Sequence, residues 1–319
     1  MAYLSFYLTP EEFKVYQEEQ ERQIRSSEEL YEWSCNNIEQ SDRFDRLKFT
    51  VLSLVPLALM MGFAGYVGYD KLNWVSSFCV LILFITIAYA WYLSVGTDSH
   101  YKYVLSKFGL VQKRNRAEPK WLNRGLQGTA FVCALGSLFA VIIAGPMALT
   151  GTGVLLLFAL GLMKRKPQNT FKTTIAQQDD WLFAHYNRQR KVIRLFHKYD
   201  DCYYEDVAAT IARRAQGRCG TYLFFKSTNE LEEIVKLLSK SWNLDCIEID
   251  NPKSLFSIQG SNPERLRCIP ARSQSYAVAD TYELKKKNAE LPYWKYFHGG
   301  KWLTKAELKD ASRPTSVME

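Results

Sequence analysis

The four longest apolar runs of the chain contain no Asp, Glu, Lys, Arg or His. These runs cover about residues 49–69, 74–95, 125–144 and 147–163. Proton relays, ion pathways and voltage sensors need ionisable side chains within the membrane, and such side chains are absent from these runs. The sequence therefore argues against a secondary transporter.

Motifs of catalysis and metal binding are missing as well. The seven cysteines stand singly without a CxxC pair, and the four histidines show neither HxxxH nor HExxH spacing. The stretch 213–220 is basic and contains two glycines, but it matches neither the P-loop nor the GxGxxG pattern. Cys219 has no histidine close to it in the sequence, so we expect an inert thiol. We expect no disulfide, metal site or cofactor, and the sequence favours a protein that is not an enzyme.

The apolar runs themselves have the length of membrane spans. Three of them come near the ~20 residues that a helix needs to cross a bilayer, and the fourth is at the lower limit, so a re-entrant segment is its alternative. Only residues 70–73 separate the first pair, and Gly145-Pro146 separates the second pair, which predicts two tight turns. The fold class that we predict is a polytopic membrane protein with four transmembrane helices in two hairpins and an α/β domain.

The positive residues predict the orientation. The loop 96–124 carries seven Lys and Arg against two acidic residues, and Lys164-Arg165-Lys166 follows the fourth run. By the positive-inside rule, this loop and both termini face the cytosol, which predicts an integral protein of a bacterial inner membrane. The net charge of +8 lies largely beside the predicted spans, so lipid head groups fit it better than nucleic acid does.

The remaining segments complete the predicted domains. Residues 1–48 form a helical segment, in which Thr9 caps a helix and Glu12 closes a capping box. Residues 164–310 form the α/β domain, and residues 311–319 form a flexible tail. The initial residues lack the basic region of a cleaved signal peptide.

Within the α/β domain, the best-defined unit is a strand, a helix and a second strand. Residues 221–226 read as the first strand, Ser227 or Thr228 as the helix cap, and residues 244–249 as the second strand. This unit implies parallel neighbouring strands. The other elements expected are helices at about 175–198 and 204–215, strands at 265–269 and 276–284, and a last helix that starts at Thr304 with Glu307.

Two groups of residues are candidate sites. The first group consists of small residues in or near the apolar runs, which allow close helix packing within one chain or between copies: Gly62, Gly65, Gly68, Gly128 and Gly136. The second group, Arg213, Arg214 and Arg218, is a candidate patch for a nucleotide, an acidic lipid head group or an acidic partner. A solvated helix end is its alternative.

These observations favour three functions. The first is a membrane anchor and assembly protein whose cytosolic domain binds a protein partner, as part of a bacterial secretion, conjugation or phage-defence machine. The alternative is a homo-oligomeric pore or membrane effector gated by the cytosolic domain. The third is an enzyme with its active site in that domain. The partners expected are therefore the lipid bilayer, further copies of the chain and a protein on the cytosolic side.

Overall fold

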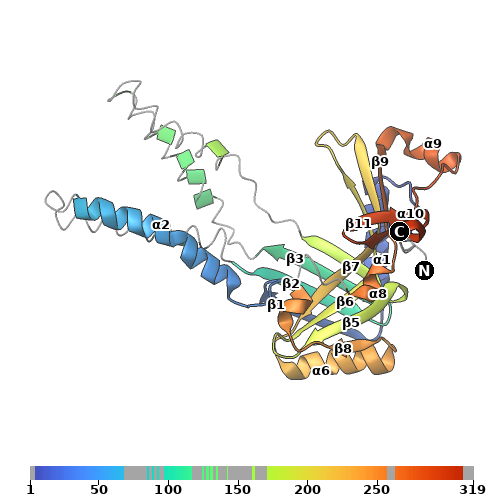
Figure 1. Cartoon of the computed structure of the whole chain (residues 1–319), viewed down its shortest axis with the longest axis horizontal. Coiled ribbons are helices and arrows are strands. Elements are labelled where there is room, and N and C mark those ends of the chain that lie inside the picture. Colours follow the sequence, from blue (N-terminus) through green and yellow to red (C-terminus); the bar gives the residue numbers. More distant parts are fainter. Residues whose placement is uncertain are drawn as a thin grey trace, which may run out of the picture. The chain divides into compact units, whose positions relative to one another are not determined.

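The computed structural model describes residues 4–67, 97–116, 171–256 and 263–311, together with isolated residues between positions 85 and 161. The chain divides into two compact units. Figure 1 labels the helices and strands of the described residues. Unit 1 comprises Met1–Cys35, Tyr101–Lys113 and Thr173–Glu319, and unit 2 comprises Asn36–His100 and Arg114–Lys172. Most of the secondary structure lies in unit 1.

A four-stranded sheet has the order β1-β2-β3-β4, with β1 Leu30–Asn37, β2 Ser99–Ser106, β3 Gly109–Arg116 and β4 Lys172–Gln177. Only Lys107 and Phe108 join β2 to β3, so these strands form an antiparallel hairpin. Gly109 has φ +150°, and a Cβ on it would lie 2.4 Å from the Ala176 carbonyl oxygen. Glycine therefore lets the hairpin turn approach the backbone of β4.

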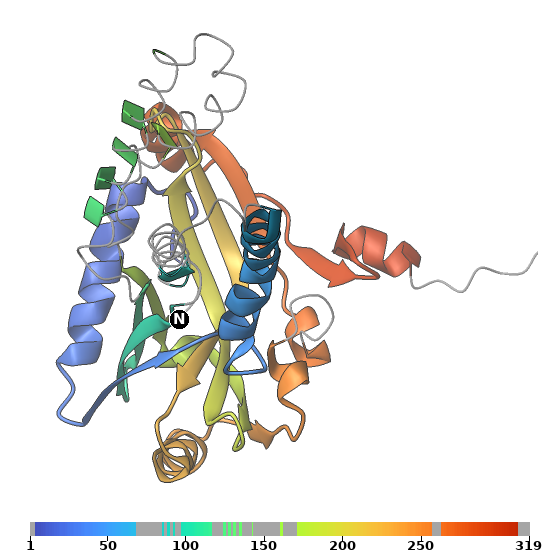
Figure 2. The same cartoon turned by 90° about the vertical axis from the view of Figure 1, so that its left-hand side faces the viewer.

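A five-stranded sheet has the order β8-β5-β6-β7-β9. Its strands are β5 Trp181–Asn187, β6 Val192–Tyr204, β7 Ile211–Phe224, β8 Cys246–Glu248 and β9 Arg272–Ala277. Strands β5, β6, β7 and β9 are antiparallel, and β8 pairs parallel with β5. Figure 2 shows the long β6–β7 pair with β9 beside it. β9 pairs with β7 from Ile211 to Gln216. Beyond Gln216, this edge of β7 has no neighbouring strand within the five-stranded sheet among the described residues.

One apolar cluster contains side chains from both sheets, and α6 Thr228–Lys236 adds Leu231 and Ile234 to it. The end of β7 that pairs with β6 but not with β9 also receives hydrogen bonds from the four-stranded sheet. Tyr103 and Gln112 donate to the Tyr222 carbonyl, each at 2.9 Å, and Trp33 Nε1 donates to the Phe224 carbonyl at 2.9 Å. These side chains satisfy backbone acceptors that would otherwise be buried without a partner.

The strand–helix–strand prediction is confirmed in its elements. Residues 221–226 overlap the end of β7, and Ser227 Oγ caps α6 by accepting a hydrogen bond from the Glu230 amide. β8 lies within the predicted 244–249 strand. The expectation of parallel neighbours is wrong, because β8 lies beyond β6 and β5 and pairs with β5.

The helices predicted at 175–198 and 204–215 are wrong, since these residues form parts of β4, β5, β6 and β7. Strands β6 and β7 each pair with a strand on both edges, and the hydropathy of a single segment does not show such pairing. In the segment 1–48, α1 Pro10–Arg25 has the predicted Thr9–Glu12 capping box, but β1 replaces the helix expected after it. The strand expected at 265–269 overlaps helix α8 Glu264–Arg267.

Short elements follow towards the end of the chain, and the last of them was predicted from the sequence. They are α7 Pro252–Phe256, α9 Thr281–Lys286, β10 Lys295–His298, β11 Lys301–Thr304 and α10 Lys305–Ala311. Thr304 Oγ1 accepts a hydrogen bond from the Glu307 amide at 3.4 Å, as the predicted last helix requires. The strand expected at 276–284 meets β9 only at its first two residues, and α9 follows.

The prediction of a four-helix membrane protein is wrong. Among the residues that the structure describes, no helix is long and apolar enough to cross a membrane. Helix α2 Asp45–Val67 coincides with most of the first predicted span, 49–69, and contains Pro56. The spans predicted at 74–95, 125–144 and 147–163 lie almost wholly outside the described residues. The described chain is a mixed α/β protein with several β-sheets.

The other predictions that depended on the four membrane spans are wrong as well. The topology, the inner-membrane localisation and the anchor role all required the apolar runs to cross a membrane, and a bilayer and a homo-oligomer find no support as partners. An apolar run shows that its side chains prefer apolar surroundings, but the run does not specify what covers them.

Candidate functional site: a basic and aromatic pocket

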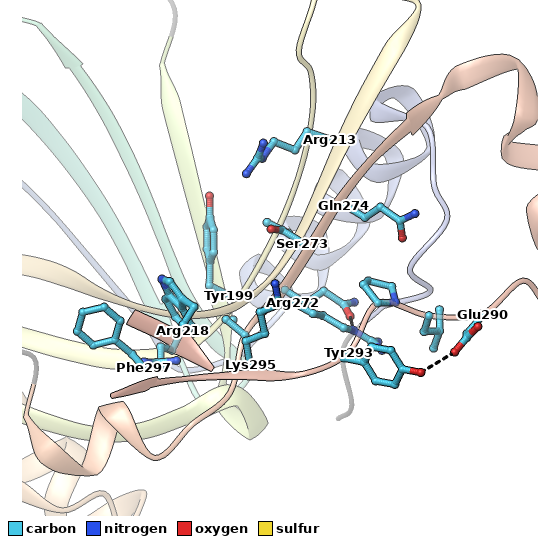
Figure 3. A pocket seen from close by; sticks show the side chains of 17 residues that line it. Tyr199, Arg213, Arg218, Arg272, Ser273, Gln274, Glu290, Tyr293, Lys295 and Phe297 are labelled. Atoms are coloured by element: carbon cyan, nitrogen blue, oxygen red, sulfur yellow. Dashed lines mark hydrogen bonds between the residues drawn. The ribbon is translucent and has the colours of Figure 1, made fainter. Parts of the chain in front are cut away.

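A pocket of about 930 Å³ opens in unit 1 beside the β7–β9 pair (Figure 3). This volume is within the range of ligand-binding clefts. Strands β7 and β9 and the β10–β11 hairpin supply most of the wall, and the segment 290–293 closes one side. The lining residues are Tyr199, Arg213, Ala215, Gln216, Gly217, Arg218, Ala271, Arg272, Ser273, Gln274, Glu290, Leu291, Pro292, Tyr293, Lys295, Phe297 and Trp302.

The charges that line the pocket are mostly positive. Arg213, Arg218, Arg272 and Lys295 are its cations, and Glu290 is its carboxylate. A concave surface with one dominant sign of charge raises the local concentration of oppositely charged groups. The pocket is therefore suited to an anionic ligand.

Aromatic rings and carbonyls hold two of these arginines in place. Arg218 donates to the Ile269 carbonyl, and its guanidinium lies 5.0 Å from the Trp302 ring centre. Arg272 Nε donates to Gln216 Oε1 at 2.8 Å, and its guanidinium lies 4.3 Å from the Trp294 ring centre. Such contacts orient the guanidinium groups while they keep their charge.

The third arginine of the wall is more exposed. Arg213 lies at one end of the pocket and pairs with Glu205 at 3.2 Å, with 41% of its side chain accessible. An exposed pair of this kind contributes little to stability, so its charge remains available to a ligand at small structural cost.

Tyrosines provide hydroxyl groups at the pocket surface. Tyr199 donates a hydrogen bond to Asp201 Oδ2 at 2.5 Å, and burial together with this carboxylate raises the pKa of Tyr199 far above its usual value. Tyr293 donates to Glu290 Oε1 at 3.1 Å, and this bond raises the pKa of Tyr293. Both phenols stay neutral at physiological pH and add no negative charge to the pocket.

The floor of the pocket requires a glycine. The Ala271 and Lys295 backbones exchange two hydrogen bonds of 2.9 Å, which join β10 to the start of β9. A Cβ on Gly217 would lie 2.9 Å from Ala271 Cβ, so a larger residue would push these segments apart.

The structure separates the three arginines predicted as one patch. Arg213 and Arg218 line the pocket, whereas Arg214 is fully buried. Arg214 pairs with Asp200 at 2.8 Å and donates to the Asp201 and Ser5 carbonyls. Its role is to hold the segment Leu4–Leu8 against β6 and β7, which is a structural role.

The sequence analysis missed Arg272, Lys295 and the aromatic wall. The stretch 291–304 showed aromatic and basic residues with a Gly299-Gly300 turn, which was the available signal. No pattern in the sequence indicated that this hairpin returns to β7.

The glycine prediction stays a prediction. Gly62 lies in α2, and neither Gly62 nor Gly128 has a described atom within 4 Å of its Cβ position. Gly65 also lies in α2, while Gly68 and Gly136 lie outside the described residues.

A cysteine and a histidine meet elsewhere on the β6–β7 pair. Cys219 Sγ lies 3.3 Å from His197 Nε2, and Thr221 Oγ1 lies 2.8 Å from the same nitrogen. Burial lowers the pKa of His197 to about 4, so its ring is neutral at pH 7. A neutral imidazole gives no positive charge to stabilise a thiolate, so the pair is a poor nucleophilic centre. No group of three metal-binding side chains occurs in the described part of the chain.

Asp180 is a partly buried carboxyl group, and burial raises its pKa to about 6. The folded state binds this proton more tightly than the unfolded state, so the stability of the fold falls as pH rises from about 4 to about 6. We expect Asp180→Asn to unfold at higher urea concentration than the natural chain at pH 7, and at nearly the same concentration at pH 4. The exposed neighbour Asp179→Asn is the control, and an equal gain at both pH values would contradict the assignment.

One known protein family matches most of the chain. Residues 14–265 match the family of the TsiV2 immunity protein, and this match covers more than half of the sequence. The chain belongs to this family, and it is therefore a bacterial protein of a toxin–immunity system. An immunity protein is loosely compatible with the predicted role as part of a bacterial secretion, conjugation or phage-defence machine. No curated protein and no solved structure matches the chain.

Proposed function

We propose that this protein protects the cell that makes it from a protein toxin, by binding that toxin. Membership of the immunity protein family is the observation that carries the proposal. The partner-binding part is the α/β portion, within the domain predicted at 164–310. The five-stranded sheet of this portion shares an apolar core with the four-stranded sheet, most of which comes from earlier residues, and this core gives a rigid framework for recognition.

A competition between sister strains tests the proposal. The gene for this chain is deleted in its own bacterium, and the deletion strain is grown in contact with the unmodified parent. We expect the deletion strain to lose viability in this co-culture, because the parent still delivers the toxin. Supplying the chain from a plasmid should restore survival.

The control for a general growth defect is a strain that lacks both this gene and the toxin gene, which should grow like the parent when it is cultured alone. Equal survival of the deletion and plasmid-bearing strains beside the parent would refute the protective role.

A further inference from the structure

The basic and aromatic side chains that line the pocket between β7, β9 and the β10–β11 hairpin favour the binding of one kind of peptide segment. We propose that it binds an acidic peptide segment of the toxin, with carboxylates on the arginines and a neighbouring apolar or aromatic side chain on the ring wall. The identity of the partner as a toxin rests on the proposed function. The acidic character of the bound segment is inferred from the residues that line the pocket.

Charge complementarity is the first argument. Four cations and one carboxylate, Glu290, line the pocket, and that carboxylate accepts a hydrogen bond from Tyr293. Glu205, which is not part of the lining, pairs with Arg213, so the positive charges still outnumber the negative ones. Three of the cations are arginines, whose planar guanidinium groups match carboxylates in a two-point geometry. An acidic segment gains attraction here, whereas a basic segment meets repulsion.

The aromatic wall is the second argument. Phe297 and Trp302 pack edge to face with ring centres 5.4 Å apart, and Trp302 also carries the Arg218 guanidinium. Leu291 and Pro292 extend the apolar part of the lining. A small inorganic anion would leave this surface uncovered, while a peptide side chain would bury it.

The backbone around the pocket is the third argument. β9 is an edge strand of the five-stranded sheet, and its residues Ser273 and Gln274 are exposed at the pocket. The Ala271–Lys295 pairing shows that the start of this edge already accepts another strand. Extended peptides bind next to such edges, which favours a peptide over a nucleic acid.

Fluorescence anisotropy with the purified full chain tests the inference. The probe is a labelled hexapeptide of Glu and Asp with one central Trp, and the matched peptide carries Gln and Asn in place of the acids. We expect the acidic peptide to bind, with affinity that falls as salt increases, and the amide peptide to bind far more weakly.

Charge-reversal variants test whether the acidic peptide binds in the pocket. We expect the double variant Arg213→Glu/Lys295→Glu to weaken binding of the acidic peptide by about tenfold or more. The control is Lys236→Glu/Lys240→Glu, which makes the same change in net charge at exposed positions of another surface. Circular dichroism melts of both variants should match the natural chain, so that lost binding reports the pocket alone.

Several results would overturn the inference. Equal binding of the two peptides, equal loss in both double variants, or tighter binding of a single-stranded DNA oligonucleotide that displaces the peptide would each do so. The co-culture assay separates the two proposals. A deletion strain that survives beside its parent refutes the immunity role, whereas a pocket variant that protects fully refutes only the acidic-segment site.

Discussion

Replacing the buried Arg214 with methionine should destabilise the fold by about 4 kcal/mol, because the substitution leaves Asp200 without its cation. Arg214 has no exposed surface, and its Nη2 lies 2.8 Å from Asp200 Oδ1. The same guanidinium donates to the Asp201 carbonyl at 2.8 Å and lies 5.2 Å from the Phe13 ring centre. Methionine keeps the apolar stem but replaces none of these interactions.

Urea denaturation followed by circular dichroism measures this loss. Arg213→Met is the matched control, because Arg213 is the preceding residue of the same strand and its ion pair with Glu205 is exposed. We expect it to cost less than about 1 kcal/mol. Asp200→Asn should cost less than Arg214→Met, since the amide oxygen still accepts from Arg214. Similar losses for Arg213→Met and Arg214→Met would show that the buried pair does not stabilise the fold.

Phe224→Ala should destabilise the fold by about 4 kcal/mol as well, through the cavity that it creates in the core. Phe224 is fully buried, and its ring lies among those of Tyr101, Tyr222 and Phe256. It stands at the end of β7, where the four-stranded sheet packs on the five-stranded sheet. The substitution therefore weakens the contact between the two sheets.

The same urea measurement applies, with two comparisons. Phe224→Leu keeps most of the volume, and we expect a loss of about 1.5 kcal/mol. Phe108→Ala removes the same ring from the β2–β3 turn, where 37% of the residue is exposed, and should cost much less. If Phe108→Ala and Phe224→Ala are equally destabilising, burial at the sheet contact is not the cause.

Arg214 and Phe224 are both buried residues of β7, the strand that also supplies residues to the pocket. Arg214 and Arg213 are adjacent on β7, yet one fixes the strand to the amino-terminal segment and the other faces the pocket. A loss of toxin protection in Arg214→Met would follow from unfolding. A loss in Arg213→Glu/Lys295→Glu with an unchanged melt would follow from the pocket.

Local features of the fold were accessible from the sequence. Thr9, Pro10 and Glu12 specify the start of α1, and Ser227 specifies the start of α6, because capping depends on neighbouring residues alone. The start of the last helix at Thr304 and Glu307 was accessible for the same reason, and the strand at 221–226 was accessible from its β-branched and aromatic residues. Two of the three arginines predicted to bind an anion do line the pocket.

The sequence by itself therefore determined the helix caps, the helix and two strands between residues 221 and 249, and the basic character of the β7 region. Only the tertiary structure decided that residues 175–215 form parts of four strands, that Arg214 is buried, and that residues 271–302 complete the pocket. The physical reason is that strand pairing and burial depend on contacts between residues far apart in the chain. Hydropathy and spacing describe a segment alone, so they carry no information about the partner that it meets.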